Sequence, residues 1–599
     1  MTMFKKFLDL LTPVELKRAY LLMVMILVMS LLDMLGVASI LPFIAVLSNP
    51  ELVQTNALLN YAFSFGSYIG INTTEQFLFS LGVLVFMLLV ISLAFKALTY
   101  YAQTRFALMR EQSIGKRLME SYLYQPYSWF LDRHSAALGK NILSEVTKVI
   151  DSGMLPLMTL IAQSMVALAL VILLIIVDPI LAVSISLSLG LFYTGILFFM
   201  SGPLKRLGRE RIDANEERFT VVNEAFSAAK EVKVRMLEQA YVQRFAKPSE
   251  IYARGQALAL VAAVLPRFML EGIAFGGILL VILYLIAKNG SFNSALPLIS
   301  LYAFAGYRLM PALQQIFSAL THLRYISPAL DVLHQELSSL KSVGAQQSQL
   351  NPLPLTEAIS LNQVSYTYPN APQPALKGIN LTIFARSRVG FVGATGCGKT
   401  TTVDVILGLL CPQEGSLSID HQPITEINRQ QWQRTIGYVP QQIYLSDDTV
   451  SANIAFGVSI ENIDQQAVER AAKIASLHDF VTGTLPHGYA TIVGERGVRL
   501  SGGQRQRIGL ARALYHNPRV LILDEATSAL DSITEQAVMD AMNSLSRNIT
   551  IIFIAHRLST VRQCDQIYLL EQGELKAQGT YEELVKTSDQ FRMMACGLN

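Results

Sequence analysis

The sequence predicts two bodies in one chain: an α-helical transmembrane domain with six spans, followed by an α/β domain with a phosphate-binding loop. Three observations predict this fold class. The 599 residues exceed the roughly 100 to 200 of a single domain. Apolar residues make up 52% and charged residues only 16%, with a mean hydropathy of +0.38, so a large part of the chain belongs in lipid. A glycine-rich motif follows a short apolar strand in the second half.

The expected boundaries follow the shifts in composition. We expect an inner-surface elbow helix at residues 1–17, a transmembrane domain with long cytoplasmic extensions at 18–335, a linker at 336–354 and the α/β domain with the phosphate-binding loop at 355–599. In the elbow segment, Phe4, Phe7, Leu8 and Leu11 share one helical face beside Lys5 and Lys6, which is typical of a helix lying on the inner leaflet. A cleaved signal peptide is the alternative, but the first apolar run is too long for one.

Six apolar runs are each near or above the ~20 residues that cross a bilayer. They lie near residues 20–47, 77–101, 153–177, 180–200, 258–287 and 295–316. No Lys or Arg occurs from residue 48 to 76, whereas four basic residues precede the first run and four follow the fourth within residues 205–211. Because cytoplasmic loops carry the excess of Lys and Arg, both termini are expected in the cytoplasm.

Two charged stretches, residues 105–151 and 205–254, are too long for loops and contain few Gly or Pro. They predict membrane helices that continue far into the cytoplasm. Within them, residues 126–130 (PYSWF) and 228–236 are candidate docking segments for a soluble domain. Simple packing is an equally good reading of an aromatic cluster such as the first.

A Ser/Gln-rich stretch at residues 342–349 leads into alternating strands and helices, and there residues 393–400 (GATGCGKT) match the phosphate-loop pattern. Glycines let backbone N–H groups close around phosphate oxygens, and the following helix N-terminus favours negative charge. Lys399 would reach the terminal phosphates, and the Thr400 hydroxyl would bind Mg²⁺. The nucleotide-binding residues predicted here are Gly393, Thr395, Gly396, Cys397, Gly398, Lys399, Thr400 and Thr401.

An apolar run at residues 520–523 is too short for a membrane span and ends in Asp524 and Glu525. It predicts a buried strand that presents two carboxylates at its C-terminal edge, where nucleotides bind in parallel sheets. Asp524 is the candidate for holding Mg²⁺ through water, and Glu525 for orienting and polarising the attacking water.

With residues 500–504 (LSGGQ) the second half resembles the nucleotide-binding domain of ABC transporters, from about residue 355 to 584. The resemblance includes Gln441 in YVPQ, Asp531 in SALD, His556 in AHR and Tyr368 in YTYP. It implies ATP and Mg²⁺ as cofactors, Tyr368 stacking on adenine, Gln441 linking Mg²⁺ and the attacking water to the membrane helices, and His556 touching the γ-phosphate. Asp531 is counted with the nucleotide site.

The resemblance also implies a partner chain. In this family the signature residues, here Ser501, Gly502 and Gly503 with Gln504, face the ATP held by the other subunit's phosphate loop. Because every motif is intact in this chain, we expect a homodimer rather than a heterodimer with one degenerate site. The segment 491–497 (TIVGERG) resembles the part by which exporters sense their docking helices, so the expected direction is outward.

For the cargo, residues 266–272 (PRFMLEG), residues 307–311 (YRLMP) and the external segment after the first span resemble bacterial lipid-linked oligosaccharide flippases. The resemblance implies a polyprenyl-diphosphate glycan as substrate and the bacterial inner membrane as location. Cations inside spans are costly and usually functional, so Arg267, Arg308 and Arg105 are the substrate candidates. The alternative for Arg267 is a structural pair with Glu271, four residues on.

Two further functions stay open. One is a multidrug or lipid A type exporter of the same architecture, and the other is an ATP-gated channel or regulatory sensor, against which Glu525 and His556 count. A net charge of +3 without a basic patch argues against a nucleic-acid partner. The expected partners are a second identical chain, membrane lipid and a lipophilic substrate.

Overall fold

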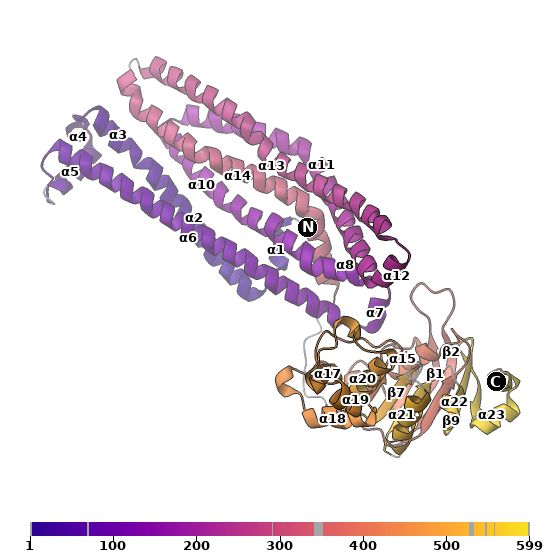
Figure 1. The fold of residues 1–599 in the computed structure, drawn as a ribbon. Coiled ribbons are helices and arrows are strands. Elements are labelled where there is room, and N and C mark those ends of the chain that lie inside the picture. Colours follow the sequence, from indigo (N-terminus) through magenta and orange to yellow (C-terminus); the bar gives the residue numbers. More distant parts are fainter. Residues whose placement is uncertain are drawn as a thin grey trace. The chain divides into compact units, whose positions relative to one another are not determined.

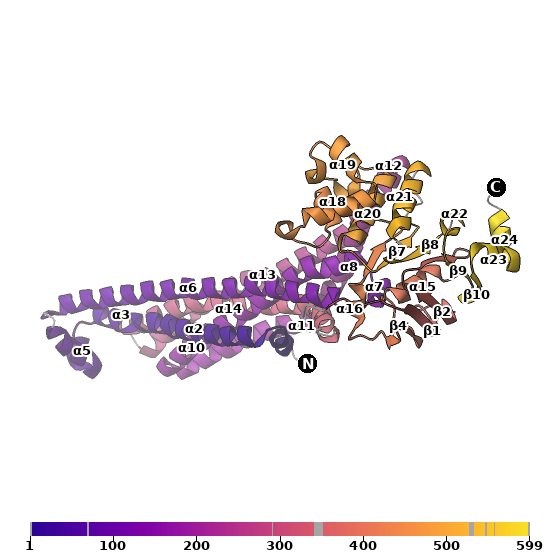
Figure 2. The ribbon, with the colours of Figure 1, turned by 90° about the horizontal axis from the view of Figure 1, so that it is seen from below.

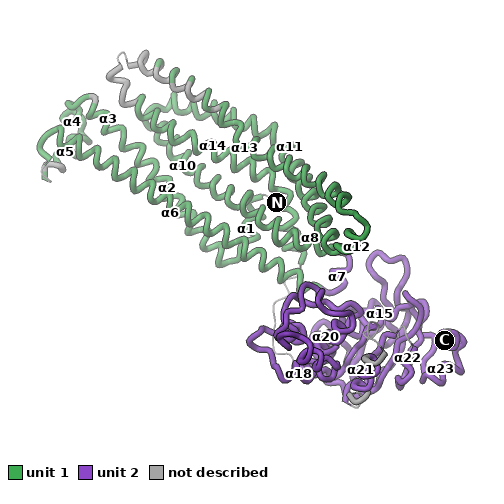
Figure 3. Tube along the Cα trace, viewed as in Figure 1, with its two compact units in different colours: residues 1–125, 133–343 green, residues 126–132, 344–599 purple. Residues whose placement is uncertain are grey.

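The computed structural model describes residues 3–68, 71–289, 292–340, 351–525, 532–545, 548–555 and 558–596. The chain divides into two compact units, which Figure 3 colours separately. The helical unit comprises residues 1–125 and 133–343, and the α/β unit comprises residues 126–132 and 344–599. The short segment 126–132, which contains the docking candidate predicted at residues 126–130, therefore clusters with the α/β unit although its chain neighbours belong to the helical unit.

The helical unit is built from long helices that lie side by side in both Figure 1 and Figure 2. Its elements are α1 (Met3–Asp9), α2 (Pro13–Ala38), α3 (Ile40–Ser48), α4 (Leu52–Thr55), α5 (Ala57–Ser67), α6 (Thr74–Leu123), α8 (Ser135–Lys140), the π-helix η1 (Asn141–Glu145), α9 (Val146–Val149), the π-helix η2 (Ile150–Met154), α10 (Leu155–Val177), α11 (Pro179–Ser227), α12 (Ala229–Val234), α13 (Glu238–Asn289) and α14 (Phe292–Ser339).

Within the described residues, four stretches are long and apolar enough to cross a membrane: Pro13–Leu47, Thr74–Leu123, Ser135–Val177 and Pro179–Ser227. They contain the first four predicted spans. The fifth and sixth fall on α13 and α14, between which residues 290 and 291 lie outside the described part. The count of six spans is consistent with this helical arrangement and stays a prediction.

Local sequence explains where these helices begin and end. The first predicted span is divided at Ser39, because Pro42 in the first turn of α3 has no N–H to continue the hydrogen bonds of α2. Asp178 ends α10 and caps α11, since its Oδ1 accepts a hydrogen bond from the Leu181 N–H at 3.3 Å. With 50 residues at 1.5 Å each, α6 measures about 75 Å and far exceeds a ~30 Å bilayer core.

Several charged side chains buried in the helical unit form ion pairs, which offsets the cost of removing a charge from water. Arg211 on α11 is 1% exposed and donates through Nη2 to Glu145 Oε2 at 2.6 Å. Asn215 Nδ2 donates to Glu145 Oε1 at 2.9 Å. This cluster joins α11 to η1. Arg110 on α6 pairs with Glu15 on α2, and both are buried.

The α/β unit contains two sheets (Figure 1). A six-stranded sheet has the order β10-β9-β3-β8-β7-β6, with parallel pairing from β9 to β6 and an antiparallel edge at β10; a four-stranded antiparallel sheet has the order β2-β1-β4-β5. The strands are β1 (Ala358–Tyr366), β2 (Leu376–Phe384), β3 (Arg388–Val392), β4 (Glu414–Ile419), β5 (Gln422–Pro423), β6 (Ile436–Val439), β7 (Val520–Asp524), β8 (Thr550–Ile554), β9 (Gln566–Glu571) and β10 (Glu574–Gly579).

The helices of this unit are α7 (Tyr127–Leu131), α15 (Lys399–Ile406), α16 (Arg429–Gln433), α17 (Val450–Ile454), α18 (Gln465–Ile474), α19 (His478–Thr484), α20 (Gly502–Tyr515), α21 (Ser532–Leu545), α22 (Leu558–Val561), α23 (Tyr581–Thr587) and α24 (Asp589–Cys596), with single 3₁₀ turns η3 (Ile460–Asn462), η4 (Gly488–Ala490) and η5 (Glu495–Gly497).

The six-stranded sheet is buried on both faces, and β7 shows how. Leu521 and Leu523 pack into one apolar cluster while Val520 and Ile522 pack into the other. This alternation is the two-residue period of a strand with a core on each side. The apolar clusters on both faces hold the central parallel strands in place. A ligand can therefore reach the sheet only at its edges, and in parallel sheets it binds to the loops at the carboxyl ends of the strands.

Candidate functional site

The phosphate loop connects β3 to α15 and needs its glycines for room and for backbone conformation. Gly393 has φ 147°, and a Cβ there would lie 2.2 Å from the Leu570 carbonyl oxygen. Gly398 has φ 106°, and a Cβ there would lie 2.9 Å from the Ala375 carbonyl oxygen. Any larger residue would clash with the backbone and strain its own φ. The loop therefore passes close to the backbone of Leu570 and of Ala375.

Lys399 stands at the start of α15 with its ammonium group inside this loop. It is 5% exposed, and Nζ donates to the carbonyl oxygens of Gly393 at 2.8 Å and Ala394 at 3.0 Å. Thr395, Gly396 and Thr400 are exposed, and nothing lies within 4 Å of a Cβ built on Gly396. The loop thus combines a buried cation, open space at its tip and an exposed hydroxyl. These residues fit a nucleotide's phosphates and an Mg²⁺ ion.

Cys397, also predicted to bind nucleotide, is a buried free thiol beneath the loop. Its Sγ lies 3.8 Å from Lys399 Nζ and fills the space under Gly393. Thr401 is 6% exposed and bonds to the Tyr368 hydroxyl at 3.1 Å. The Tyr368 ring makes an edge contact with Tyr366, their centroids 5.1 Å apart. The predicted adenine-stacking ring is therefore held beside the phosphate-loop helix.

The two carboxylates at the end of β7 reach the same edge of the sheet, because β8 lies between β3 and β7 and all three strands are parallel. Asp524 is 6% exposed and accepts from the Tyr438 hydroxyl at 3.5 Å. Glu525 has φ 50°, a left-handed backbone conformation that is uncommon for a residue with a Cβ. Gln441 Nε2 donates to Glu525 Oε2 at 2.9 Å. The structure thus brings together Lys399, Asp524, Glu525 and Gln441 as predicted site residues of one region.

Sequence reasoning missed Asp404 on α15. Burial raises the pKa of its carboxyl to about 6, and the charge of Asp524 adds to the rise. Burial, with the charges of Asp524 and Asp404, also raises the pKa of Tyr438. Tyr127 on α7 has its pKa raised by burial and then by Asp404. The sequence did contain a signal for this residue, because Asp404 is an acid that stands among the apolar residues Val403, Val405 and Ile406 on the helix after the phosphate loop.

The signature residues form the N-terminus of α20. The Ser501 hydroxyl oxygen accepts from the Gln504 N–H at 3.2 Å, and the Ser501 N–H donates to Gln504 Oε1 at 2.8 Å. This capping box leaves the Ser501 hydroxyl proton available to a further acceptor. Ser501 is exposed and Gly502 and Gly503 are half-buried, so the helix N-terminus is open to an anion. His556 and Asp531, the other predicted nucleotide residues, lie outside the described part of the chain.

The three candidate substrate cations have different surroundings. Arg267 donates through Nε to Glu271 at 2.9 Å, so the structural pair considered as the alternative for this residue is formed. Arg105 is exposed on α6 and has no ion pair among the described residues. Arg308 is 18% exposed at its side chain and lies 3.4 Å from Asp33 Oδ1.

Asp33 is the centre of a buried cluster that joins three helices. Lys96 on α6 lies 3.5 Å from Asp33 Oδ2, and the Ser92 hydroxyl donates to Asp33 Oδ1 at 2.6 Å. The Asp33 side chain is 1% exposed, whereas that of Lys96 is 36% exposed. With Arg308 from α14, two cations surround one acid, and the cluster carries a net charge of +1.

Comparison with known proteins follows the same division of the chain. Family models described as "ABC transporter transmembrane region" and "ABC transporter" match residues 52–308 and 376–528. An ATP-dependent lipid A-core flippase of Cupriavidus metallidurans is 33% identical over 78% of this chain and 78% of its own length. That of Chromobacterium violaceum is 31% identical over 79% and 80%. An ABC multidrug transporter of Trichophyton rubrum is 42% identical over 39% of this chain and 18% of its own length.

The solved structure of a bacterial Atm1-family ABC exporter with ATP bound superimposes with a TM-score of 0.78 at 22% identity, covering 97% of this chain and 98% of the other. At that identity the likeness establishes the fold, which is that of an ABC exporter. Both family models agree with this fold, and so do the two flippases that are 31% and 33% identical over more than three quarters of the chain. The chain belongs to the ABC transporter family: it is a multi-pass membrane protein whose ATPase domain is coupled to transport.

Proposed function

We propose that two copies of this chain form an ATP-driven flippase in the bacterial inner membrane, which moves a glycolipid with a phosphate-bearing headgroup toward the outer leaflet. One observation carries the flippase activity. Relatives named as lipid A-core flippases align over nearly four fifths of the chain, through both the membrane and the ATPase parts. The other steps of the proposal rest on the geometry of particular residues.

In the ATPase reaction, Lys399 would bind the β- and γ-phosphates, and Thr400, Asp524 and Gln441 would hold Mg²⁺. Bound Mg²⁺ neutralises charge that develops on the phosphates. Glu525 orients and polarises the attacking water, and the bond from Gln441 holds its carboxylate at the end of β7. His556 contacts the γ-phosphate and Tyr368 stacks on adenine, as the family resemblance implies.

Dimerisation is supported by the open N-terminus of α20. Its exposed Ser501 retains a hydroxyl proton, and the helix N-terminus is a further anion site. The phosphate loop and the signature helix of one chain each form half of an ATP site. Two identical chains complete both sites, and hydrolysis then requires the pair.

The cluster around Asp33 supports an anionic substrate group. A cation inside a span is costly unless it pairs with something, and here one carboxylate faces both Lys96 and Arg308. The surplus positive charge matches a phosphate or diphosphate. Lipid-linked oligosaccharide and lipid A-core both carry such groups. The sequence segments around Arg267 and Arg308 favour a lipid-linked oligosaccharide. The flippases that align over nearly four fifths of the chain favour lipid A-core.

A polar cavity in the helical unit supports a headgroup rather than an apolar drug. It measures about 180 Å³ and is lined from η2, α10 and α14 by Asp151, Thr159, Gln315, Ser318 and His322, with three apolar residues. Side chains that both donate and accept suit sugar hydroxyls. The π-helix η2 at its wall is a distortion found frequently at functional sites.

Reconstitution in liposomes tests the proposal. Fluorescent lipid-linked oligosaccharide and fluorescent lipid A-core are placed in separate vesicles, and ATP-dependent loss of the label from the leaflet that bears the ATPase domain is measured by quenching. Movement of either glycolipid, abolished without Mg²⁺, supports the flippase and identifies which candidate is carried. Movement of neither glycolipid, with ATPase activity stimulated by hydrophobic drugs instead, contradicts it in favour of multidrug export. ATP binding without turnover would indicate a channel or sensor.

Two variants separate substrate binding from structural support in the Asp33 cluster. Arg308→Met removes one cation and leaves Asp33 paired with Lys96, so we expect glycolipid-stimulated ATPase activity to fall about tenfold while basal activity persists. Asp33→Asn removes the acid and leaves both cations for the substrate, so we expect stimulation to survive. Equal loss of stimulation in both variants, with equal loss of thermal stability, would assign the cluster to structure alone.

A further inference from the structure

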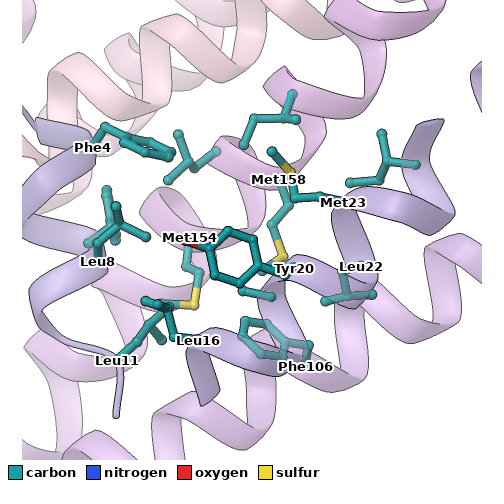
Figure 4. A pocket seen from close by; sticks show the side chains of 15 residues that line it. Phe4, Leu8, Leu11, Leu16, Tyr20, Leu22, Met23, Phe106, Met154 and Met158 are labelled. Carbon is teal, nitrogen blue, oxygen red and sulfur yellow. The ribbon is translucent and has the colours of Figure 1, made fainter. Parts of the chain in front are cut away.

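A second cavity in the helical unit differs from the polar one in both place and chemistry. It measures about 170 Å³ and lies among α1, α2, α6, η2 and α10 (Figure 4). Its lining is aliphatic, aromatic or methionine throughout: Phe4, Phe7, Leu8, Leu11, Leu16, Ala19, Tyr20, Leu22, Met23, Ile26, Phe106, Met154, Leu157, Met158 and Ile161. Phe4 and Tyr20 at its rim are 47% and 66% exposed, so the cavity opens to the outside of the unit.

Hydrogen bonds fix the level of this cavity along the helices. Arg117 Nη1, near the end of α6 that leads to residues 126–132, donates to the Leu10 carbonyl oxygen at 2.6 Å. Lys6 pairs with Asp331 on α14 at 2.5 Å. The elbow helix α1 is thereby held toward the cytoplasmic ends of α6 and α14. Phe106 lies about 16 Å further up α6 at 1.5 Å per residue, so the cavity extends from headgroup depth into the acyl region.

Basic side chains flank the apolar wall. Lys5 follows Phe4, and Lys17 and Arg18 lie between the lining residues Leu16 and Ala19. Lys5, Lys17 and Arg18 are exposed, and none of them forms an ion pair with another described residue. Anionic lipids of the cytoplasmic leaflet attract basic residues at this depth.

We propose that this cavity holds one acyl chain of an anionic phospholipid from the cytoplasmic leaflet, whose headgroup is bound by Lys5, Lys17 and Arg18. The volume agrees with part of a single chain, since an apolar cavity of about 150 Å³ takes a benzene-sized molecule and stays dry. Methionine side chains on the wall, Met23, Met154 and Met158, adapt to a flexible apolar occupant. No residue lines both this cavity and the polar one, although η2 and α10 contribute to each, and the site does not depend on which substrate is transported.

The bound lipid adds to the interactions that already hold α1, which are the Arg117 bond to Leu10 and the Lys6–Asp331 pair. Its acyl chain contacts α1, α2, α6 and α10 at once, and its headgroup bridges α1 and the first turns of α2. Occupancy therefore stabilises the helical unit on the side where α6 leads to residues 126–132. An anionic phospholipid is the stabilising cofactor that this arrangement selects, because a zwitterionic headgroup offers no net charge to three basic side chains.

Fluorescence quenching by brominated lipids tests the site. The chain has two tryptophans, Trp129 and Trp432, both outside the cavity. Tyr20→Trp therefore adds a reporter at the rim, where the exposed phenol position tolerates the larger ring. Leu168→Trp, at a residue that is 61% exposed on α10 and does not line the cavity, is the matched control. The parent signal is subtracted, and the protein is measured in phosphatidylcholine vesicles that contain increasing fractions of acyl-brominated phosphatidylglycerol.

We expect the Tyr20→Trp reporter to be quenched at mole fractions several-fold lower than the Leu168→Trp reporter. Removing two charges with Lys17→Gln and Arg18→Gln should weaken this preference by about fivefold per charge. Filling the cavity with Met158→Trp should abolish ATPase stimulation by phosphatidylglycerol, whereas Leu168→Trp should retain it. Identical quenching of both reporters would overturn the proposal, and so would equal quenching of Tyr20→Trp by brominated phosphatidylcholine and by brominated phosphatidylglycerol. Absence of quenching of Tyr20→Trp by either lipid would also overturn it, because it would show that protein, such as a second copy of the chain, covers the site.

Discussion

Replacing Glu525 with glutamine tests the assigned chemistry with little structural change. The side chain keeps its size, and its amide oxygen can still accept the bond that Gln441 Nε2 now donates to the carboxylate at 2.9 Å. Folding and ATP binding should therefore stay within a few tenths of a kcal/mol of the parent. What is lost is the negative charge that polarises water, a general-base contribution of roughly 100- to 10,000-fold, or about 3 to 5 kcal/mol of barrier.

The assay is steady-state phosphate release from the reconstituted dimer, alongside binding of a fluorescent ATP analogue. We expect turnover to fall at least 100-fold with unchanged nucleotide affinity and with accumulation of an ATP-bound closed dimer. Glu414→Gln, an exposed carboxylate at the start of β4, is the control and should hydrolyse ATP normally. Turnover of Glu525→Gln within tenfold of the parent would refute the role given to this residue.

Two further predictions concern the phosphate loop and its helix. Gly393→Ala should lower ATP affinity more than tenfold and lower the free energy of unfolding by about 1 to 3 kcal/mol, because its new Cβ would lie 2.2 Å from a carbonyl oxygen. Gly483→Ala is the control and should change neither ATP affinity nor stability, since a Cβ there meets nothing within 4 Å. Equal nucleotide titration curves for the two variants would contradict this account of the loop. Asp404→Asn should raise thermal stability at pH 7 in nucleotide-free protein. The pKa of Asp404 is about 6 in the folded protein, above the reference value of 3.8. Its carboxyl therefore contributes stability that is fully present below pH 4 and is lost as the pH rises through 6. The gain, on the order of 1 to 3 kcal/mol, should therefore vanish below pH 4 in melting curves, and a pH-independent gain would exclude titration of Asp404.

The sequence was sufficient for the features that repeat along the chain. The apolar runs predicted the long helices, and the charged stretches predicted their extension, seen in the 50 residues of α6. The short apolar run that ends in Asp524 and Glu525 and the glycine pattern after β3 predicted the sheet edge and its phosphate loop. These features are local, so composition and spacing are enough to recognise them.

Features that depend on distant residues were not predicted. Asp404 acquires its raised pKa from burial and from Asp524, which is far along the chain. Arg308 was considered by itself, whereas in the structure Asp33 faces both Arg308 and Lys96. Only packing of α2, α6 and α14 brings these groups together. The break of the first span at Ser39 had a local cause in Pro42, and the length of the apolar run concealed it.

The assignment of residues 126–132 to the α/β unit has a consequence for biosynthesis. Tyr127 leaves the ribosome about 280 residues before Asp404, whose charge it faces in the finished protein. At roughly 5 to 20 residues per second, this interval lasts about 15 to 55 s. During that time the aromatic segment has no native surface to pack on. Newly made chains thus pass through a stage in which this short stretch is open to chaperones and proteases, and that stage lasts at least until the ribosome has passed Asp404, inside the domain that hydrolyses ATP.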